Sequence, residues 1–233
     1  MEWFIIRIIF FDTETSGLNW QDNNIIELAM LTVENGVITD DYDEFVNIEK
    51  PIPPKITRIT SITNDMLKTK GLDEKIIAED IAERLTPGTL MIAHNCQFDL
   101  LFLFNLLRKY LPDEAYEIVK NVYWLDTLTV LKDRKKYPHK LIDAVNHYGI
   151  EEVHFHRAID DTKALRNVTI ALRNERNDLA EYINVFGYNP KYDVEGVRFP
   201  FIIYKKQRFN NCMVEEDKIL PKLKDKASQD YPF

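Results

Sequence analysis

Apolar runs rich in Ile and Val alternate along the chain with stretches in which apolar residues recur at helical spacing. This alternation is typical of an α/β domain, in which buried strands and amphipathic helices follow one another. Residues 4–12, 24–34 and 36–48 are predicted to be strands, and Asn35-Gly36 between the last two is a strong hairpin signal. The second and third strands are therefore expected to pair as a hairpin.

The rest of the chain predicts a series of helices separated by short strands. The proline-rich stretch at residues 51–63 is interpreted as a loop. Helices are predicted at residues 72–85, around 100–107, from 126, at 140–148 and at 160–175, and strands at 89–93 and 122–125. After about residue 184 the composition shifts to turns and a β-prone segment. We therefore expect a main domain over residues 1–180 and a C-terminal extension of unknown role over 181–233.

The composition limits the class of protein. Of 233 residues, 45% are hydrophobic and 12% aromatic, which is enough to bury a substantial core. The two cysteines, Cys96 and Cys212, indicate neither a disulfide framework nor a zinc site, so a reducing compartment fits best. The apolar start at residues 3–11 is too short to span a membrane and is interrupted by Arg7. We therefore expect a cytoplasmic protein with no membrane partner.

The formal net charge of -8 gives no general attraction to nucleic-acid backbones. A nucleic-acid partner would need a local basic patch, bound cations, or both. The densest basic stretch is KDRKKYPHK at residues 132–140. Its plain interpretation is a solvated loop, and its functional interpretation is a set of phosphate contacts made by Lys132, Arg134, Lys135, Lys136 and Lys140.

Acidic residues stand where predicted strands end and predicted helices begin. Asp12 and Glu14 close the first strand two positions apart, so both side chains project to the same side. Asp99 begins a helix just after a buried strand, and Asp161 begins another, five positions after His156. Each acid alone has an ordinary interpretation as a turn residue or a helix N-terminal acid. Their conjunction points to a shared site.

Together these segments resemble the three motifs of the DEDD-superfamily exonucleases, His subclass, the family of the proofreading subunit of bacterial replicative DNA polymerase. The matching segments are FDTETSGL at residues 11–18, HNCQFD at 94–99 and HRAIDDTKA at 156–164. The segments ITRITSITNDML and LDTLTVLKDRKKYPHKLIDAVNHYGI support the resemblance, which covers about residues 4–176. Cys96 replaces a common Ala and Ser61 a usual Gly.

The resemblance implies an RNase H-like α/β fold, a mixed β-sheet flanked by helices, and a metal-dependent 3′–5′ exonuclease that releases nucleoside 5′-monophosphates. It gives metal-ligand roles to the four carboxylates and a general-base role to His156. It gives substrate-binding roles to Thr13, Gly17, Leu18, Asn95 and Phe98. His94 and His154 are interpreted as structural.

The implied chemistry explains the residue types. Phosphodiester hydrolysis places negative charge on the transition state and the leaving oxygen, while the attacking water loses a proton. Two divalent ions about 3.5–4 Å apart meet both demands, and carboxylate oxygens suit Mg²⁺ or Mn²⁺ better than zinc. Repulsion among the acids is relieved when cations bind. A histidine with an ordinary pKa of about 6.5 can accept the proton near neutral pH.

Three functional alternatives stay open at this stage. By family resemblance the favoured substrate is DNA, as single-stranded 3′ ends, with a DNA polymerase as a candidate partner. An RNA-trimming exonuclease of the same family uses the same chemistry, and no residue here reveals a contact to the ribose 2′-OH that would distinguish it. A non-catalytic nucleic-acid-binding or polymerase-docking module is the third interpretation, and the complete set of four carboxylates and a histidine argues against it.

Overall fold

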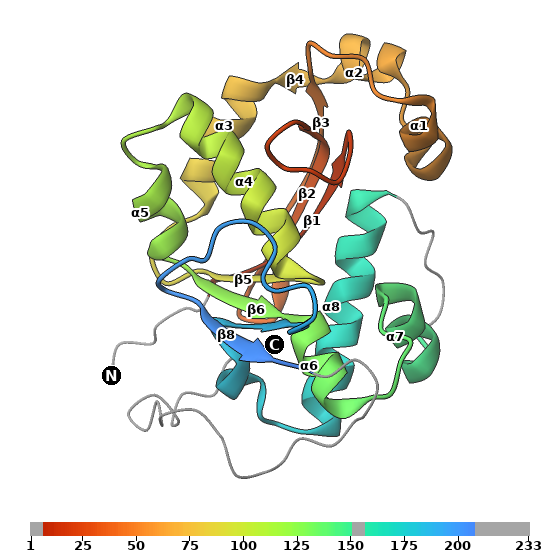
Figure 1. Cartoon of the computed structure of the whole chain (residues 1–233), viewed down its shortest axis with the longest axis vertical. Coiled ribbons are helices and arrows are strands. Elements are labelled where there is room, and N and C mark those ends of the chain that lie inside the picture. The colour runs from red at the N-terminus through yellow and green to blue at the C-terminus, as the bar shows by residue number, and fades with distance from the viewer. Residues whose placement is uncertain (1–6, 151–156, 208–233) are drawn as a thin grey trace.

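Eight strands form one mixed sheet in the computed structural model, which describes residues 7–150 and 157–207 (Figure 1). The strand order is β4-β3-β2-β1-β5-β6-β7-β8. The strands β1, β2 and β3 pair antiparallel, and the other neighbours are parallel. Their bounds are β1 Arg7–Thr15, β2 Ile25–Glu34, β3 Val37–Asn47, β4 Leu72–Asp73, β5 Leu90–Ala93, β6 Tyr123–Asp126, β7 Val185–Tyr188 and β8 Ile203–Lys206.

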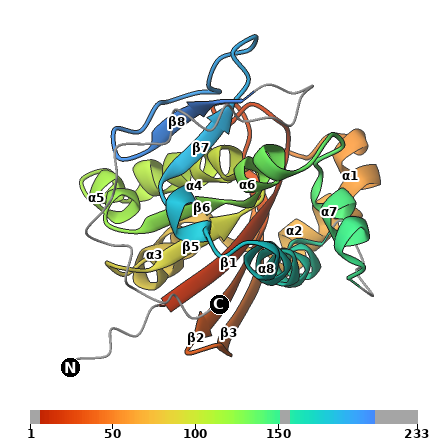
Figure 2. The same ribbon diagram turned by 90° about the horizontal axis from the view of Figure 1, so that it is seen from below.

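Helices cover both faces of this sheet (Figure 2). One face carries α3, α4 and α5, the other carries α6, α7 and α8, and α1 and α2 lie near β2 and β3. Their bounds are α1 Pro54–Thr60, α2 Asn64–Lys70, α3 Glu74–Arg84, α4 Cys96–Tyr110, α5 Ala115–Lys120, α6 Thr127–Arg134, α7 Leu141–Tyr148 and α8 Ala158–Glu175, with a short η1 at Leu179–Tyr182. The predicted α/β architecture, a mixed sheet flanked by helices, is confirmed.

Strand β1 lies in the centre of the sheet and is buried on both faces. Ile9 and Phe11 belong to the core under α3 and α4, whereas Ile8 and Phe10 belong to the core under α8. This alternation follows from the two-residue period of a strand. It also decides which helix faces each side chain at the end of the strand, where the acidic residues stand.

The interpretation of residues 51–63 as a loop is wrong, because residues 54–60 form α1. Pro54 occupies the first helical position, where its missing N–H costs no hydrogen bond and its fixed φ suits the helix. The helix ends at Ser61, which has a φ of 62° and donates its backbone N–H to the carbonyl of Thr57. The prolines of this stretch therefore begin a helix instead of preventing one.

The described part of the C-terminal extension continues the sheet. Strand β7 pairs with β6 at Leu125 and Val185, and β8 pairs with β7 along its length. The expected boundary near residue 180 stays a prediction, and residues 208–233 lie outside the described part of the chain. Within the described ranges, no helix has the length and apolar character needed to cross a membrane.

Candidate active site

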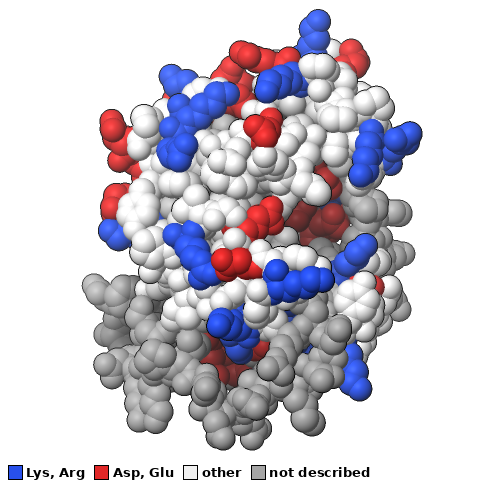
Figure 3. Space-filling model, viewed as in Figure 1, with Lys and Arg blue, Asp and Glu red and all other residues white. Residues whose placement is uncertain are grey.

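Three carboxylates gather where β1 ends. Asp12 and Glu14 occupy the positions that continue the α8-facing side of β1, and Asp161 lies in the first turn of α8. One carboxylate oxygen from each lies within 4.8 Å of the others. Figure 3 shows Asp and Glu side chains in a hollow at the place where Figure 1 has the N-terminal end of α8. The structure thus brings together three of the four predicted acids.

Asp99 approaches from the opposite side of β1, on α4. The Thr13 hydroxyl donates a hydrogen bond of 2.7 Å to its carboxylate, which is 4% exposed. Thr13 is the residue between Asp12 and Glu14, so the alternation of β1 directs it toward α4. Asp99 is not one of the three acids within 4.8 Å, but its charge raises the pKa values of Asp12 and Glu14.

The start of α4 is held in place by Asp126, at the end of β6. Its Oδ1 accepts the backbone N–H groups of Asn95 and Cys96, at 2.9 and 3.3 Å. Asn95 has a φ of 74°, a left-handed conformation that turns the chain sharply from β5 into the helix. Because β5 and β6 run parallel, their ends meet at one edge of the sheet. Asp126 thereby fixes the helix that carries Asp99.

Burial and mutual repulsion raise the pKa values of the clustered acids. The pKa of Asp12 is raised well above its ordinary value, first by burial and then by the charges of Asp99 and Asp161. Burial, followed by Asp161, raises the pKa of Glu14 to about 7. Burial also raises the pKa of Asp99 to about 7, against a lowering by the Thr13 hydrogen bond. These carboxyl groups are therefore partly protonated at neutral pH, and added positive charge would favour their ionised forms.

Glu27 is a buried acid that the sequence analysis missed. It stands on β2 directly opposite Glu14 and is 0% exposed. Its carboxylate accepts the Arg157 Nε–H at 2.8 Å and the Ala158 backbone N–H at 3.1 Å. Arg157 also pairs with Asp43 on β3 at 3.5 Å. These contacts join the N-terminal end of α8, and so Asp161, to β2, which pairs with β1, and to β3.

The predicted substrate-binding residues surround the end of β1 in different ways. Leu18 is 79% exposed in the turn after β1. Gly17 leaves room for Asn23, whose side-chain oxygen would lie 2.4 Å from a Cβ at that position. Phe98 is half-buried, with its ring 4.9 Å from that of Phe102, and Asn95 is exposed.

The described structure accounts for one of the two histidines expected to be structural. The Nδ1 of His94 lies 3.0 Å from the Thr127 hydroxyl, and its Nε2 lies 2.8 Å from the backbone oxygen of His139. Both ring nitrogens are therefore engaged within the fold. His154 and the predicted general base His156 lie outside the described residues.

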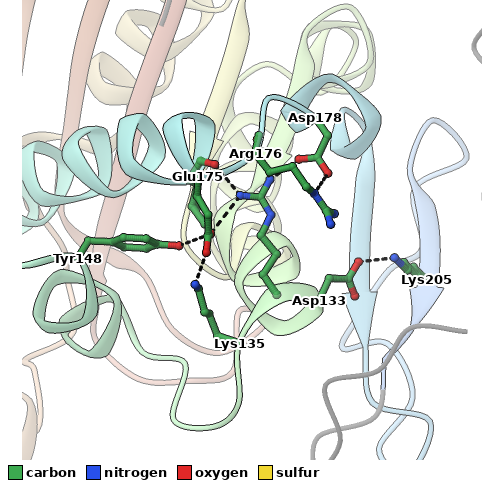
Figure 4. Close-up of polar contacts among 9 residues, drawn as sticks. Asp133, Lys135, Tyr148, Glu175, Arg176, Asp178 and Lys205 are labelled. Atoms are coloured by element: carbon green, nitrogen blue, oxygen red, sulfur yellow. Dashed lines mark hydrogen bonds and ion pairs between the residues drawn. The ribbon is translucent and has the colours of Figure 1, made fainter. Parts of the chain in front are cut away.

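The basic stretch at residues 132–140 is divided between structural and exposed side chains. Arg134 donates to the carbonyl of Leu172 at 2.6 Å and pairs with Asp178, and only 5% of its side chain is exposed. Figure 4 shows Lys135 and Tyr148 converging on Glu175, at the end of α8. Residues 132–134 thus belong to α6 and not to the expected solvated loop, and Lys136 and Lys140 are the exposed cations of the stretch.

The clustered acids fit a divalent cation. Three carboxylate oxygens within 4.8 Å of one another repel, and a doubly charged ion among them would remove that repulsion. Oxygen ligands without nitrogen or sulfur are the set that Mg²⁺ and Mn²⁺ prefer. Burial first, and then the charges of the neighbouring acids, raise the pKa values of Asp12 and Glu14, and a bound cation would favour their ionised forms.

Comparison with known proteins places this geometry among nucleases. The RNase_T family, described as exonuclease, matches residues 9–169. The chain is 36% identical over 162 residues to the DNA polymerase III PolC-type of Halalkalibacterium halodurans, covering 68% of this chain and 11% of that protein. It is 30% identical over 177 residues to the protein of the same name from Caldanaerobacter subterraneus subsp. tengcongensis, covering 74% of this chain and 12% of the relative. The chain therefore spans a small part of the length of the curated relatives it matches.

A solved structure shows the same fold. The zinc-bound E. coli ExoI–ssDNA complex has a TM-score of 0.67 and 19% sequence identity, and the match covers 76% of this chain and 42% of that chain. This likeness confirms the predicted RNase H-like fold class.

Proposed function

The chain belongs to the RNase_T exonuclease family, and we propose that it is a 3′–5′ exonuclease that removes nucleoside 5′-monophosphates from single-stranded DNA ends. Enzymes of this family need divalent metal ions, and the acid cluster fits that need. We further propose that two ions act, that they are Mg²⁺ or Mn²⁺, and that Asp12, Glu14, Asp99 and Asp161 hold them.

The observation that carries this proposal is the meeting of Asp12, Glu14 and Asp161 within 4.8 Å. These acids come from two segments separated by more than 140 residues of chain, and both segments were singled out by their motifs. A module that only binds nucleic acid gains nothing from half-buried, mutually repelling carboxylates, because each lowers its stability and repels phosphate. The cluster therefore favours hydrolysis over a docking role.

In this proposal each side chain has a defined task. Bound divalent ions supply the positive charge that stabilises the transition state and lowers the pKa of the attacking water. Thr13 orients the Asp99 carboxylate through its hydrogen bond, and Glu27 holds the start of α8 through Arg157. His156 takes the proton released by the water. Leu18 and Phe98 contact the terminal bases.

DNA is favoured over RNA because the relatives are named as DNA polymerases and the solved neighbour is a complex with single-stranded DNA. The same names make a DNA polymerase the favoured partner class. The RNA-trimming alternative uses the same acids, so the substrate must be distinguished by experiment.

The direct test is digestion of matched strands labelled at either end. We expect 5′-labelled single-stranded DNA to shorten one nucleotide at a time in Mg²⁺ or Mn²⁺, with nucleoside 5′-monophosphates released, and no hydrolysis in EDTA. Duplex DNA and RNA of the same sequence should be degraded more slowly. Release of the 5′ label as a mononucleotide in the first turnovers would contradict the direction, and faster hydrolysis of RNA would favour the alternative substrate.

The exposed cations of the basic stretch give a second test. Replacing Lys136 and Lys140 by Gln is expected to lower the slope of log affinity against log salt by about 0.7 for each lost phosphate contact on a single strand. Arg134→Gln should instead lower the free energy of unfolding by about 2 kcal/mol, because it removes the charged hydrogen bonds of Arg134 to the Leu172 carbonyl and to Asp178, while Asp178 keeps its pair with Arg176. Binding titrations from 50 to 200 mM salt, roughly the range where such contacts weaken, and urea unfolding measure the two effects. An unchanged slope in the double variant would show that neither lysine contacts a phosphate.

A further inference from the structure

An open groove of about 580 Å³ lies beside the candidate active site. One wall is the turn after β1, residues 18–21, and the other is part of the β7–β8 loop, residues 195–197. Leu18 follows Glu14 by four residues, so the first wall begins where the acid-bearing strand ends. The second wall belongs to the C-terminal extension, the part of the chain for which the sequence indicates no role.

The second wall is fixed to the helix that carries Asp99. Gln97, two residues before Asp99, donates its side-chain amide to the backbone oxygens of Glu195 and Val197, at 2.8 and 2.9 Å. The Tyr204 hydroxyl, on β8, donates to the Oε1 of the same glutamine at 3.1 Å. In Figure 1 the blue β7–β8 loop crosses in front of α4, in agreement with these contacts. The helix α4 therefore holds both Asp99 and the second wall of the groove.

The two walls also meet directly. Gly196 has a φ of +68°, and a Cβ there would lie 2.8 Å from the Trp20 Nε1 and 2.7 Å from the Leu101 side chain. Trp20 is in turn attached to α4, because its backbone oxygen accepts the Asn105 side-chain amide at 3.0 Å. Only glycine combines this backbone conformation with this close approach. The β7–β8 loop therefore packs closely against Trp20 at Gly196.

The lining suits a nucleobase better than a phosphate. Leu18, Trp20 and Val197 offer apolar and aromatic surface, and Asn19 and Gln21 add uncharged polar groups. The charged member is Glu195, a carboxylate, and neither Lys nor Arg is among the lining residues 18–21 and 195–197. A phosphate would be repelled, whereas the flat face of a base stacks on aromatic and apolar side chains.

We propose that this groove binds an unpaired base of the substrate strand next to its 3′ end, and that the C-terminal extension thereby forms part of the substrate-binding surface. The inference rests on the proposed function and names the part of the substrate that residues 195–197 contact. A paired base is covered on its hydrogen-bonding edge by its partner and cannot enter between the walls. The groove therefore favours single strands over duplexes.

An abasic scan of the substrate combined with Trp20→Ala tests the groove. Single-stranded DNA with one abasic site at successive positions from the 3′ end is hydrolysed by the wild type and the variant in saturating Mg²⁺. We expect one position at which loss of the base raises the wild-type KM about tenfold with little change in kcat. Trp20→Ala should raise the KM for intact DNA by a similar factor and be insensitive to the abasic site at that position. Tyr192→Ala removes another aromatic side chain, 72% exposed, from the same loop outside the groove lining, and should match the wild type.

Val197→Asp tests the groove if Trp20→Ala does not fold. It changes a side chain that is 38% exposed on the loop wall and adds a second carboxylate to the groove. It should raise KM and lose the same positional sensitivity. Additive effects of variant and abasic site at every position would overturn the groove while leaving the exonuclease intact. Absence of hydrolysis of any strand would instead overturn the proposed function, and the groove inference with it.

Discussion

Replacing Asp12 by Asn is expected to lower the single-turnover rate of hydrolysis by about 1,000-fold or more in saturating Mg²⁺. The change keeps the size of the side chain but removes the charge that the cluster of Asp12, Glu14 and Asp161 needs to hold a divalent ion. Metal ions contribute several kcal/mol of transition-state stabilisation, and each 1.36 kcal/mol or so corresponds to a tenfold change in rate. Asp161→Asn should act in the same way.

Asp160→Asn is the matched control for these variants. Asp160 lies in the same first turn of α8 but is outside the group of three acids within 4.8 Å. Its replacement should leave the rate within a few-fold of the wild type. Rapid-quench measurements on a 5′-labelled strand give the rates. Equal losses of rate in the Asp160 and Asp161 variants would show that the loss of any negative charge near the start of α8, and not the loss of a metal ligand, lowers the rate.

Asp12→Asn and Asp161→Asn are expected to be more stable than the wild type when metal is absent. The folded state raises the pKa of Glu14 from its ordinary 4.5 to about 7, so between these values the folded protein binds more protons than the unfolded chain. Under that condition stability falls as pH rises. The wild-type Tm in EDTA should therefore decline from pH 4.5 to pH 7, and the decline should be smaller in Asp12→Asn. Added Mg²⁺ should raise the wild-type Tm at pH 7 by binding the folded state.

The order of strands and helices was largely predictable because hydrophobic periodicity is local. The strand that ends in Asp12 and Glu14, and the helices that begin near Asp99 and Asp161, are all visible in short windows of sequence. Helix α1 was missed for a local reason as well. A proline at the first position of a helix looks, in sequence, like a proline in a loop.

The contacts that complete the site could not be predicted, because they join residues far apart in the chain. Glu27 stands in the apolar run IIELAML, and its partner Arg157 is 130 positions away. A charged residue inside an otherwise apolar run was the available signal. Arg134 and Lys135 stand in a basic stretch whose plain interpretation is solvated, but Asp178, just after α8, pairs with Arg134, and Glu175, at the end of α8, pairs with Lys135.

The groove illustrates the same limit. Its walls, residues 18–21 and 195–197, are separated by most of the chain, and the amide of Gln97 that attaches the second wall to α4 carries no motif signal by itself. The C-terminal extension shows no role in its sequence, because a turn-rich segment has no periodicity. The pairing of β8 with β7 and the hydrogen bonds of Gln97 hold that segment against α4.

His156→Ala is expected to lower the single-turnover rate by about 10² to 10⁴-fold, the usual loss when a positioned general base is removed. The residue lies outside the described part of the structure, so this expectation rests on the third motif, in which it precedes Asp161 by five positions. Metal and substrate binding should be retained, because all four carboxylates remain. His154→Ala, two positions earlier, is the matched control and should leave the rate near that of the wild type.

The pH dependence distinguishes a general base from a structural histidine. The wild-type rate should rise with pH as the imidazole loses its proton, around its ordinary pKa of about 6.5. His156→Ala should lose this limb of the profile and follow the ionisation of the attacking water instead. Metal must be saturating at every pH, because protons compete with cations at Glu14 and Asp99, whose pKa values are both raised to about 7 without metal. Single-turnover rates from about pH 5.5 to 9, centred on that pKa, separate the two cases. If His156→Ala kept the wild-type rate and pH profile, the general base would be another residue, and His154 would be tested first.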